Sequence, residues 1–106
     1  VKTKLKMTSY NMKKEKVESL EQARAQIDVI DSALVELIAA RQYYVDQTTR
    51  FKKSETDMQT PERQAQILER LRNQATSLGL DAQLIEQLYQ TMFQHFIQRE
   101  LKQFRP

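Results

Sequence analysis

The amino-acid sequence predicts an all-α protein of three helices, one long and two shorter. Residues that interrupt helices are rare, because the chain of 106 residues contains one glycine and two prolines. The turn residues that β-hairpin proteins place about every 8 to 12 positions are therefore missing. Apolar residues instead recur at steps of three and four, the spacing of one face of an α-helix. The length is that of a single domain.

The first helix is expected from about residue 20 to about residue 52. Ser19 and Gln22 have the spacing of a capping box, in which side chains satisfy free backbone N–H groups at a helix start. The apolar stripe that follows consists of Leu20, Ala23, Ile27, Ile30, Leu34, Leu37, Tyr44 and Phe51.

This helix is too long for its own chain to cover. It would measure about 50 Å, whereas a globule of roughly 100 residues has a radius of gyration near 13 Å. The stripe therefore requires a second chain, and we expect a homodimer in which the protomers share their long helices. The alternative is a helix broken between Arg41 and Tyr44, which would give a monomeric four-helix bundle.

Two shorter helices follow. Thr60, Pro61 and Glu62 provide a capping residue, a proline at the first helical position and an acid in the first turn, which together predict a helix start. Gly79 is expected to end this helix, and Asp81 to cap the third. The predicted buried faces are Ile67, Leu68, Leu71, Ala75 and Leu78 in the second helix, and Ile85, Leu88, Tyr89, Met92, Phe93 and Phe96 in the third.

The composition excludes several classes of functional site. The chain has no cysteine, and His95 is its single histidine. Disulfides, thiolate metal sites and paired-histidine zinc sites are therefore impossible. A Gly-rich phosphate loop is also missing. We expect no metal and no cofactor.

Positive charge is concentrated at the N-terminus. Residues 1–18 contain six lysines and two glutamates, a net charge of +4, whereas the whole chain carries +3. The apolar residues of this segment are scattered, unlike those of a signal peptide, and no stretch is apolar enough to span a bilayer. We expect a disordered basic tail over residues 1–18 and a helical domain over residues 19–106. We also expect a cytoplasmic location, with no nucleic-acid and no membrane partner.

Charged residues occupy positions where the stripes call for apolar ones. Arg41 takes the heptad position that follows Leu34 and Leu37. A buried guanidinium needs an anion beside it, either a carboxylate of the protein or a bound ligand. Lys52 lies three turns further along on the same side, and Glu100 continues the buried stripe of the third helix.

Two further arginines are weaker signals. Arg24 could pair with Asp28 one turn later, and Arg63 lies in an exposed first turn where charges are usual.

The ordered set of these residues resembles the all-α chorismate mutase family over residues 20 to about 101. The set is Arg24-x-x-Ile27-Asp28-x-x-Asp31, then Leu37 and Arg41, then Lys52, then Pro61-Glu62-Arg63. The isochorismate-pyruvate lyase branch is similar at Arg50-Phe51-Lys52-x-Ser54-Glu55, Pro61-Glu62-Arg63 and Gly79-Leu80-Asp81-Ala82. The resemblance implies an intertwined three-helix homodimer with two sites for a small cyclohexadienyl ether dicarboxylate.

The resemblance also implies roles for the site residues. Arg41, Lys52 and Arg63 would come from one protomer and Arg24 from the other. Arg24 and Arg41 would clamp the two substrate carboxylates, which suit the planar fork of a guanidinium. Lys52 would donate to the ether oxygen as the carbon–oxygen bond breaks. Glu100, at the last site position of the family, would donate to the same oxygen when protonated.

Two reactions fit this set of residues. The first is the rearrangement of chorismate to prephenate in aromatic amino acid biosynthesis, which needs positioning and charge stabilisation rather than a nucleophile. The alternative is isochorismate-pyruvate lyase, which forms salicylate. Gln64 stands where mutases often use a glutamate for the ring hydroxyl, and Phe96 where some have a hydroxyl residue; the connection between Lys52 and Arg63 is also one residue shorter than in the best-known bacterial mutase pattern. These departures weaken the case for efficient mutase activity and leave the lyase, or a related branch acting on another chorismate-derived acid, as a competitor.

Glu100, where the lyase pattern has glutamine, favours the mutase. A third reading, from a different class, is a non-catalytic helical dimerisation or regulatory module whose basic tail binds an acidic partner. It accounts for the long helix and the tail, but it leaves Arg41 and Lys52 on the buried side unexplained.

Overall fold

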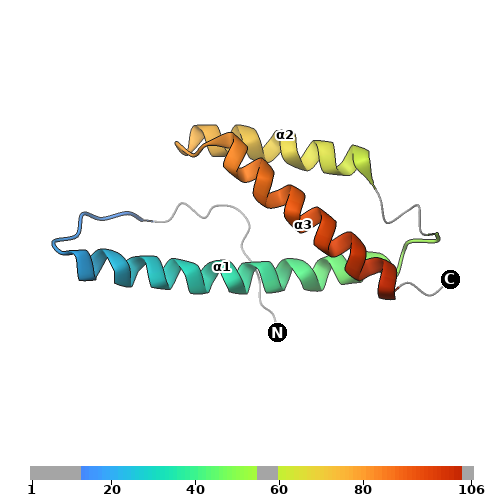
Figure 1. The fold of residues 1–106 in the computed structure, drawn as a ribbon, viewed down its shortest axis with the longest axis horizontal. Helices are drawn as coiled ribbons and strands as arrows, with labels where there is room; N and C mark the ends of the chain where they lie inside the picture. Colours follow the sequence, from blue (N-terminus) through green and yellow to red (C-terminus); the bar gives the residue numbers. More distant parts are fainter. Residues whose placement is uncertain (1–12, 55–59, 104–106) are drawn as a thin grey trace. The chain divides into compact units, whose positions relative to one another are not determined.

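A computed structural model describes residues 13–54 and 60–103, in which three α-helices follow one another (Figure 1). Helix α1 spans Leu20–Thr49, α2 spans Pro61–Ser77 and α3 spans Ala82–Gln103. No strand occurs within these described ranges, so the all-α class with one long and two shorter helices is confirmed. The chain divides into two units, Val1–Val35 and Glu36–Pro106, and α1 contributes to both.

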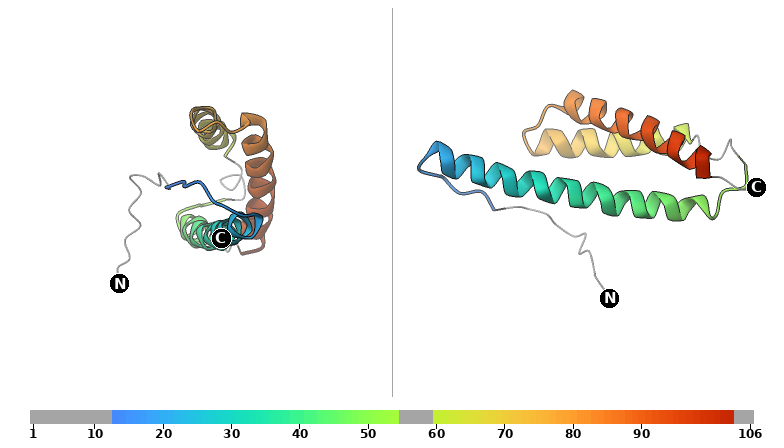
Figure 2. Two further views of the ribbon diagram at one scale, coloured as in Figure 1. Left: turned by 90° about the vertical axis from the view of Figure 1, so that its left-hand side faces the viewer. Right: turned by 60° about the horizontal axis from the view of Figure 1, so that its bottom comes forward.

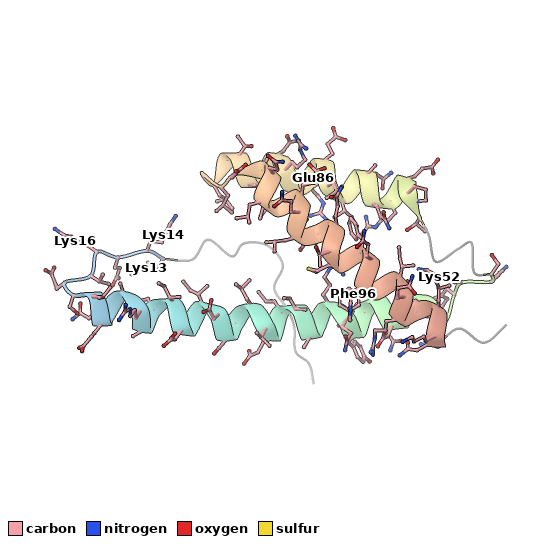
Figure 3. All side chains as sticks on the ribbon, in the orientation of Figure 1. Lys13, Lys14, Lys16, Lys52, Glu86 and Phe96 are labelled. Carbon is pink, nitrogen blue, oxygen red and sulfur yellow. The ribbon has the colours of Figure 1, made fainter. Side chains whose placement is uncertain are left out.

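The N-terminal unit contains the start of α1. Ser19 Oγ accepts a hydrogen bond from the backbone N–H of Gln22 at 3.1 Å, as the capping box predicts. The Gln22 side chain accepts from the backbone N–H of Glu18 at 2.7 Å, one residue before the expected partner. Residues 13–17 have no regular secondary structure, and their lysines are exposed (Figure 3). Residues 1–12 of the predicted tail lie outside the described residues.

Helix α1 is continuous, so the alternative of a break between Arg41 and Tyr44 is wrong. No residue of α1 is buried within the chain. Its apolar stripe is exposed, with Leu34 at 50%, Leu37 at 45% and Tyr44 at 61% of full accessibility. The stripe therefore exists as predicted, and the chain by itself does not cover it.

In the C-terminal unit, a short turn joins α2 to α3, and α3 runs back along α2 (Figure 2). Gly79 adopts φ 80°, a left-handed conformation that glycine reaches without a steric penalty. The backbone N–H of Leu80 donates to the carbonyl of Ala75 at 2.8 Å, and that of Gly79 to Thr76 at 3.1 Å. These bonds form a Schellman motif, so the predicted end of the second helix is confirmed.

The other helix starts agree with the sequence in part. Asp81 Oδ1 accepts from the backbone N–H of Gln83 at 2.9 Å, which confirms the predicted cap of α3. Thr60 occupies the N-cap position of α2, and Pro61 takes the first turn. The capping role predicted for the Thr60 side chain is wrong, because its hydroxyl makes no cap hydrogen bond. Only its carbonyl joins the helix, accepting from Gln64 N at 2.9 Å.

The core of the C-terminal unit lies between α2 and α3. Its buried apolar residues are Ile67, Ala75, Phe93 and Phe96, all of them members of the predicted stripes. Leu78 and Leu88, which the stripes also include, remain 56% and 52% exposed. None of the helices in the described ranges combines the length and the apolar character needed to cross a membrane.

Ion pairs connect the helices of this unit. Arg72 of α2 pairs with Glu86 of α3, and Glu86 is labelled in Figure 3. Arg99 of α3 donates to both carboxylate oxygens of Asp46 on α1, at 3.1 and 2.9 Å. The hydrogen bonds from Arg99 hold the pKa of the Asp46 carboxyl below its usual value of 3.8, and Asp46 in turn raises the pKa of Arg99.

The Asp46–Arg99 pair predicts a pH-dependent contribution to stability. Asp46 binds its proton more weakly in the folded chain, so the contribution is fully present above about pH 4 and is lost as pH falls through the lower folded pKa. We expect Asp46→Asn to lower the free energy of unfolding slightly at pH 7 and to match wild type at strongly acidic pH. Urea titrations across this range test it, with the exposed Asp28→Asn as control. An equal loss at both extremes would contradict the prediction.

Candidate active site

A cavity of about 390 Å³ lies in the C-terminal unit, where residues of α1, α2 and α3 meet. Five of the six predicted site residues line it, namely Arg41, Lys52, Arg63, Gln64 and Glu100. The remaining lining residues are Tyr44, Val45, Thr48, Thr60, Ile67, Phe93, Phe96 and Ile97. Residues far apart in the sequence therefore surround one space.

Glu100 is the most buried charged group of the site, with 3% of its surface exposed. It lies one turn after Phe96 on the buried face of α3, as the stripe predicts. The ammonium of Lys52 is 3.2 Å from Glu100 Oε2 and 3.5 Å from Oε1 (Figure 3 labels Lys52 and Phe96). The hydroxyls of Thr48 and Thr49 each lie 3.3 Å from Oε2. The buried carboxylate is therefore paired with a cation and hydrogen-bonded, as a charge in the interior requires.

Lys52 reaches the cavity from outside helix α1, which ends at Thr49 rather than near residue 52. Three successive hydrogen bonds of the i to i+3 type carry the backbone onward, the last from Lys52 N to the Thr49 carbonyl at 3.2 Å. This winding is tighter than that of an α-helix. The hydroxyl of Thr48 donates to the Val45 carbonyl at 2.6 Å, and such side-chain bonds compete with regular helix pairing.

Arg41 lies half-buried against aromatic rings rather than against a carboxylate. Its guanidinium carbon is 5.5 Å from the ring centre of Tyr89 and 5.7 Å from that of Phe96. None of the ion pairs among residues 13–54 and 60–103 includes Arg41. The alternative of an intramolecular ion pair at this position is therefore not found there. Cation–π contact holds the guanidinium at the cavity, and no carboxylate of the described chain occupies its N–H donors.

The other predicted residues differ in their placement. Arg63 and Gln64 lie in the first turn of α2 and line the cavity, Arg63 exposed and Gln64 partly so. Arg24 is an exposed residue of the N-terminal unit and is not among the lining residues, so its part in the site stays a prediction. The pairing of Arg24 with Asp28 is not among the ion pairs of the described residues.

The structure adds residues that the sequence reasoning missed. Thr48 follows Arg41 by one heptad, so the same periodicity that singled out the arginine could have found it. Thr49 has no such signal, because its contact with Glu100 depends on how α3 packs. Tyr89 was expected to be a packing residue, and its ring also supports Arg41.

The electrostatic character of the cavity follows from its charged lining. Among the lining residues that the structure describes, three carry cationic side chains, Arg41, Lys52 and Arg63, and one, Glu100, carries a carboxylate. This excess of positive charge, with an apolar wall that includes Phe93 and Phe96, suits a small organic molecule that carries more than one negative charge. The fold and the cavity together describe an all-α protein whose cavity has a lining suited to a small polyanion.

Comparison with known proteins identifies the family. Residues 23–101 match the family described as chorismate mutase type II. The chain is also 35% identical over 82 residues to a protein of Pseudomonas aeruginosa named isochorismate pyruvate lyase, and the match covers 77% of this chain and 81% of that protein. The chain belongs to the chorismate mutase type II family, as its resemblance predicted.

Proposed function

We propose that this protein is a chorismate mutase that binds the chorismate dianion in the cavity and accelerates its rearrangement to prephenate. The observation that carries the proposal is the meeting of Arg41, Lys52 and Glu100 around one cavity in a chain of this family. The reaction is pericyclic, so the protein need supply only a fixed geometry and charges that complement the transition state.

Arg41 is suited to bind a substrate carboxylate. The rings of Tyr89 and Phe96 limit the motion of its guanidinium, so less conformational entropy is lost when a ligand binds. A guanidinium offers two parallel N–H donors to one carboxylate. Arg63 adds a second cation from α2. We assign the second carboxylate to Arg24 of another protomer.

Lys52 and Glu100 are suited to stabilise the ether oxygen. Negative charge grows on this oxygen as its bond to the ring breaks, and donors already in position stabilise it with little reorganisation. The Lys52 ammonium and the Glu100 carboxyl lie within 3.2 Å of each other, so both can reach one substrate atom. Glu100 assists only in its protonated form, because an ionised carboxylate has no proton to donate.

The active form in this proposal is a homodimer. The apolar stripe of α1 remains exposed from Leu20 at 64% to Tyr44 at 61%, and Phe51, just after the helix, is 73% exposed. A continuous exposed face of this kind marks an interaction surface. We assign it to a second copy of the same chain, whose α1 would bring Arg24 to the cavity.

The second candidate is the isochorismate-pyruvate lyase reaction. It is favoured by the similarity to the Pseudomonas aeruginosa protein of that name and by Gln64, which offers an uncharged amide where many mutases have a glutamate. The same carboxylate clamp and the same donors to the ether oxygen serve both reactions.

A product assay separates the two candidates. We expect the purified chain to convert chorismate to prephenate, and chromatography to detect little salicylate or pyruvate when isochorismate is supplied instead. Salicylate and pyruvate as the main products would make the lyase the correct assignment. Turnover of neither substrate would contradict both.

Removing the cations should affect catalysis far more than folding. We expect Lys52→Ala and Arg41→Ala each to reduce kcat/KM at least a hundredfold, since the loss of one donor to a developing oxyanion costs about 3 to 4 kcal/mol. The exposed Arg70→Ala, on α2 outside the cavity, serves as control and should behave as wild type. Circular dichroism checks that each variant folds. Full activity of Lys52→Ala would remove the proposed mechanism.

Mixed dimers test whether Arg24 acts in the site of its partner. Arg24→Ala and Lys52→Ala should each be nearly inactive alone. When the two are unfolded together and refolded, half of the dimers are mixed, and each mixed dimer has one intact site. We expect about a quarter of wild-type activity. Mixtures with no more activity than the separate variants would place Arg24 outside the partner's site.

The pH profile tests the proton on Glu100. If the protonated carboxyl is the donor, activity should decline as rising pH removes its proton. Glu100→Gln keeps an N–H donor at every pH, so its profile should be flat over the same range. An unchanged decline in Glu100→Gln would assign the titration to another group.

A further inference from the structure

The hydrogen-bond partners of Glu100 are distributed unevenly between its two oxygens. Oε2 has three, the Lys52 ammonium at 3.2 Å and the hydroxyls of Thr48 and Thr49 at 3.3 Å each. Among the residues that the structure describes, Oε1 has only the longer contact with Lys52, at 3.5 Å. The two threonines therefore hold one side of the carboxyl and leave Oε1 as the oxygen with spare capacity.

The two hydroxyls are not equivalent, because each has one proton to donate. Thr48 Oγ1 lies 2.6 Å from the Val45 carbonyl, much closer than its 3.3 Å from Glu100. The Thr48 hydroxyl therefore donates its proton to the Val45 carbonyl, and a lone pair of the same oxygen faces Glu100. Thr49 Oγ1 lies 3.5 Å from the same carbonyl and 3.3 Å from Glu100, so its proton is directed to the carboxyl.

We propose that Thr48 and Thr49 are positioning residues that act on Glu100 in opposite senses. Thr49 donates to Oε2 and favours the ionised form of the carboxyl. Thr48, whose proton is donated to Val45, turns a lone pair toward Oε2 and disfavours the ionised form, which leaves the proton of the neutral carboxyl on Oε1. Together they fix the orientation of the carboxyl group, and their effects on its ionisation oppose each other. The inference rests on the proposed function, in which the protonated carboxyl is the donor to the ether oxygen.

The charged groups around Glu100 are shared by all the variants needed to test this. Arg41 of α1, Lys52 after α1 and Arg63 of α2 line the same cavity. Arg99 of α3 is paired with Asp46 of α1. Replacing a threonine by valine keeps the shape of the side chain and leaves these charges in place, so a change in titration is due to the lost hydroxyl.

The experiment measures the titration of Glu100 directly in the full chain. The protein is labelled with ¹³C at the glutamate carboxyl carbon, and the Glu100 signal is identified by its loss in Glu100→Gln. We expect the midpoint of titration to move to lower pH in Thr48→Val and to higher pH in Thr49→Val. Each displacement should be about half a pH unit or more, as for the loss of one hydrogen bond.

Controls separate a hydroxyl effect from a change in folding. Thr76→Val removes an equivalent hydroxyl bond, from Thr76 to the Arg72 carbonyl at 3.1 Å on α2, and should titrate as wild type. Thr48→Ser and Thr49→Ser lose a methyl group but keep the hydroxyl, so both should titrate with the wild-type midpoint. The proposal is overturned if the titration midpoint moves in the same direction in both valine variants, or if it moves in neither of them.

The titration needs no substrate, so its result can be read whether or not the proposed function holds. If the wild-type chain converts neither chorismate nor isochorismate, the function fails while the opposite displacements still decide the roles of the threonines. If turnover occurs, the pH at which activity declines should move with the titration in each variant. If the titration midpoint of Glu100 moves but the pH at which activity declines does not, the threonines act on Glu100 but not on catalysis.

Discussion

The ion pair between Lys52 and Glu100 is the contact on which the site depends. It joins the segment after α1 to the buried face of α3, and Glu100 is 3% exposed. Removing two charges from water costs several kcal/mol per ion, and mutual attraction often does no more than offset this. Stability alone is therefore a weak explanation for a buried glutamate paired with a half-buried lysine. The proposed function, in which a cation and a proton donor meet at one substrate atom, would give this arrangement a reason.

The cations of the cavity are held in different ways. Lys52 is fixed by a carboxylate, and its position follows from a backbone that winds more tightly after Thr49. Arg41 is fixed by the faces of two rings, which satisfy the guanidinium without neutralising it. The cavity thus contains one internally balanced charge pair and two cations, Arg41 and Arg63, that form no ion pair with a carboxylate of the described residues. Cations without a protein partner are expected in a site that an anionic ligand completes.

The sequence predicted the helices well because their signals are local. The Schellman turn at Gly79 and the cap at Asp81 each depend on a few neighbouring residues, and both are present. The heptad position of Arg41 and the stripe position of Glu100 led correctly to two lining residues, since helical periodicity decides which face a side chain takes. The end of α1 was misjudged because the hydroxyl of Thr48 donates to the Val45 carbonyl, which periodicity does not register. The contact of Thr49 with Glu100 depends on packing between distant segments and has no counterpart in spacing.

The aromatic support of Arg41 also decides how the site responds to dissolved salt. Mobile ions screen charges that act over a Debye length, about 8 Å at physiological ionic strength. A guanidinium resting on the uncharged faces of Tyr89 and Phe96 is held at contact range by groups that attract no counterions. Added salt therefore weakens the long-range electrostatic attraction between the cavity and an anionic ligand but leaves Arg41 in place. Its effect falls on the rate of association rather than on the geometry of the site.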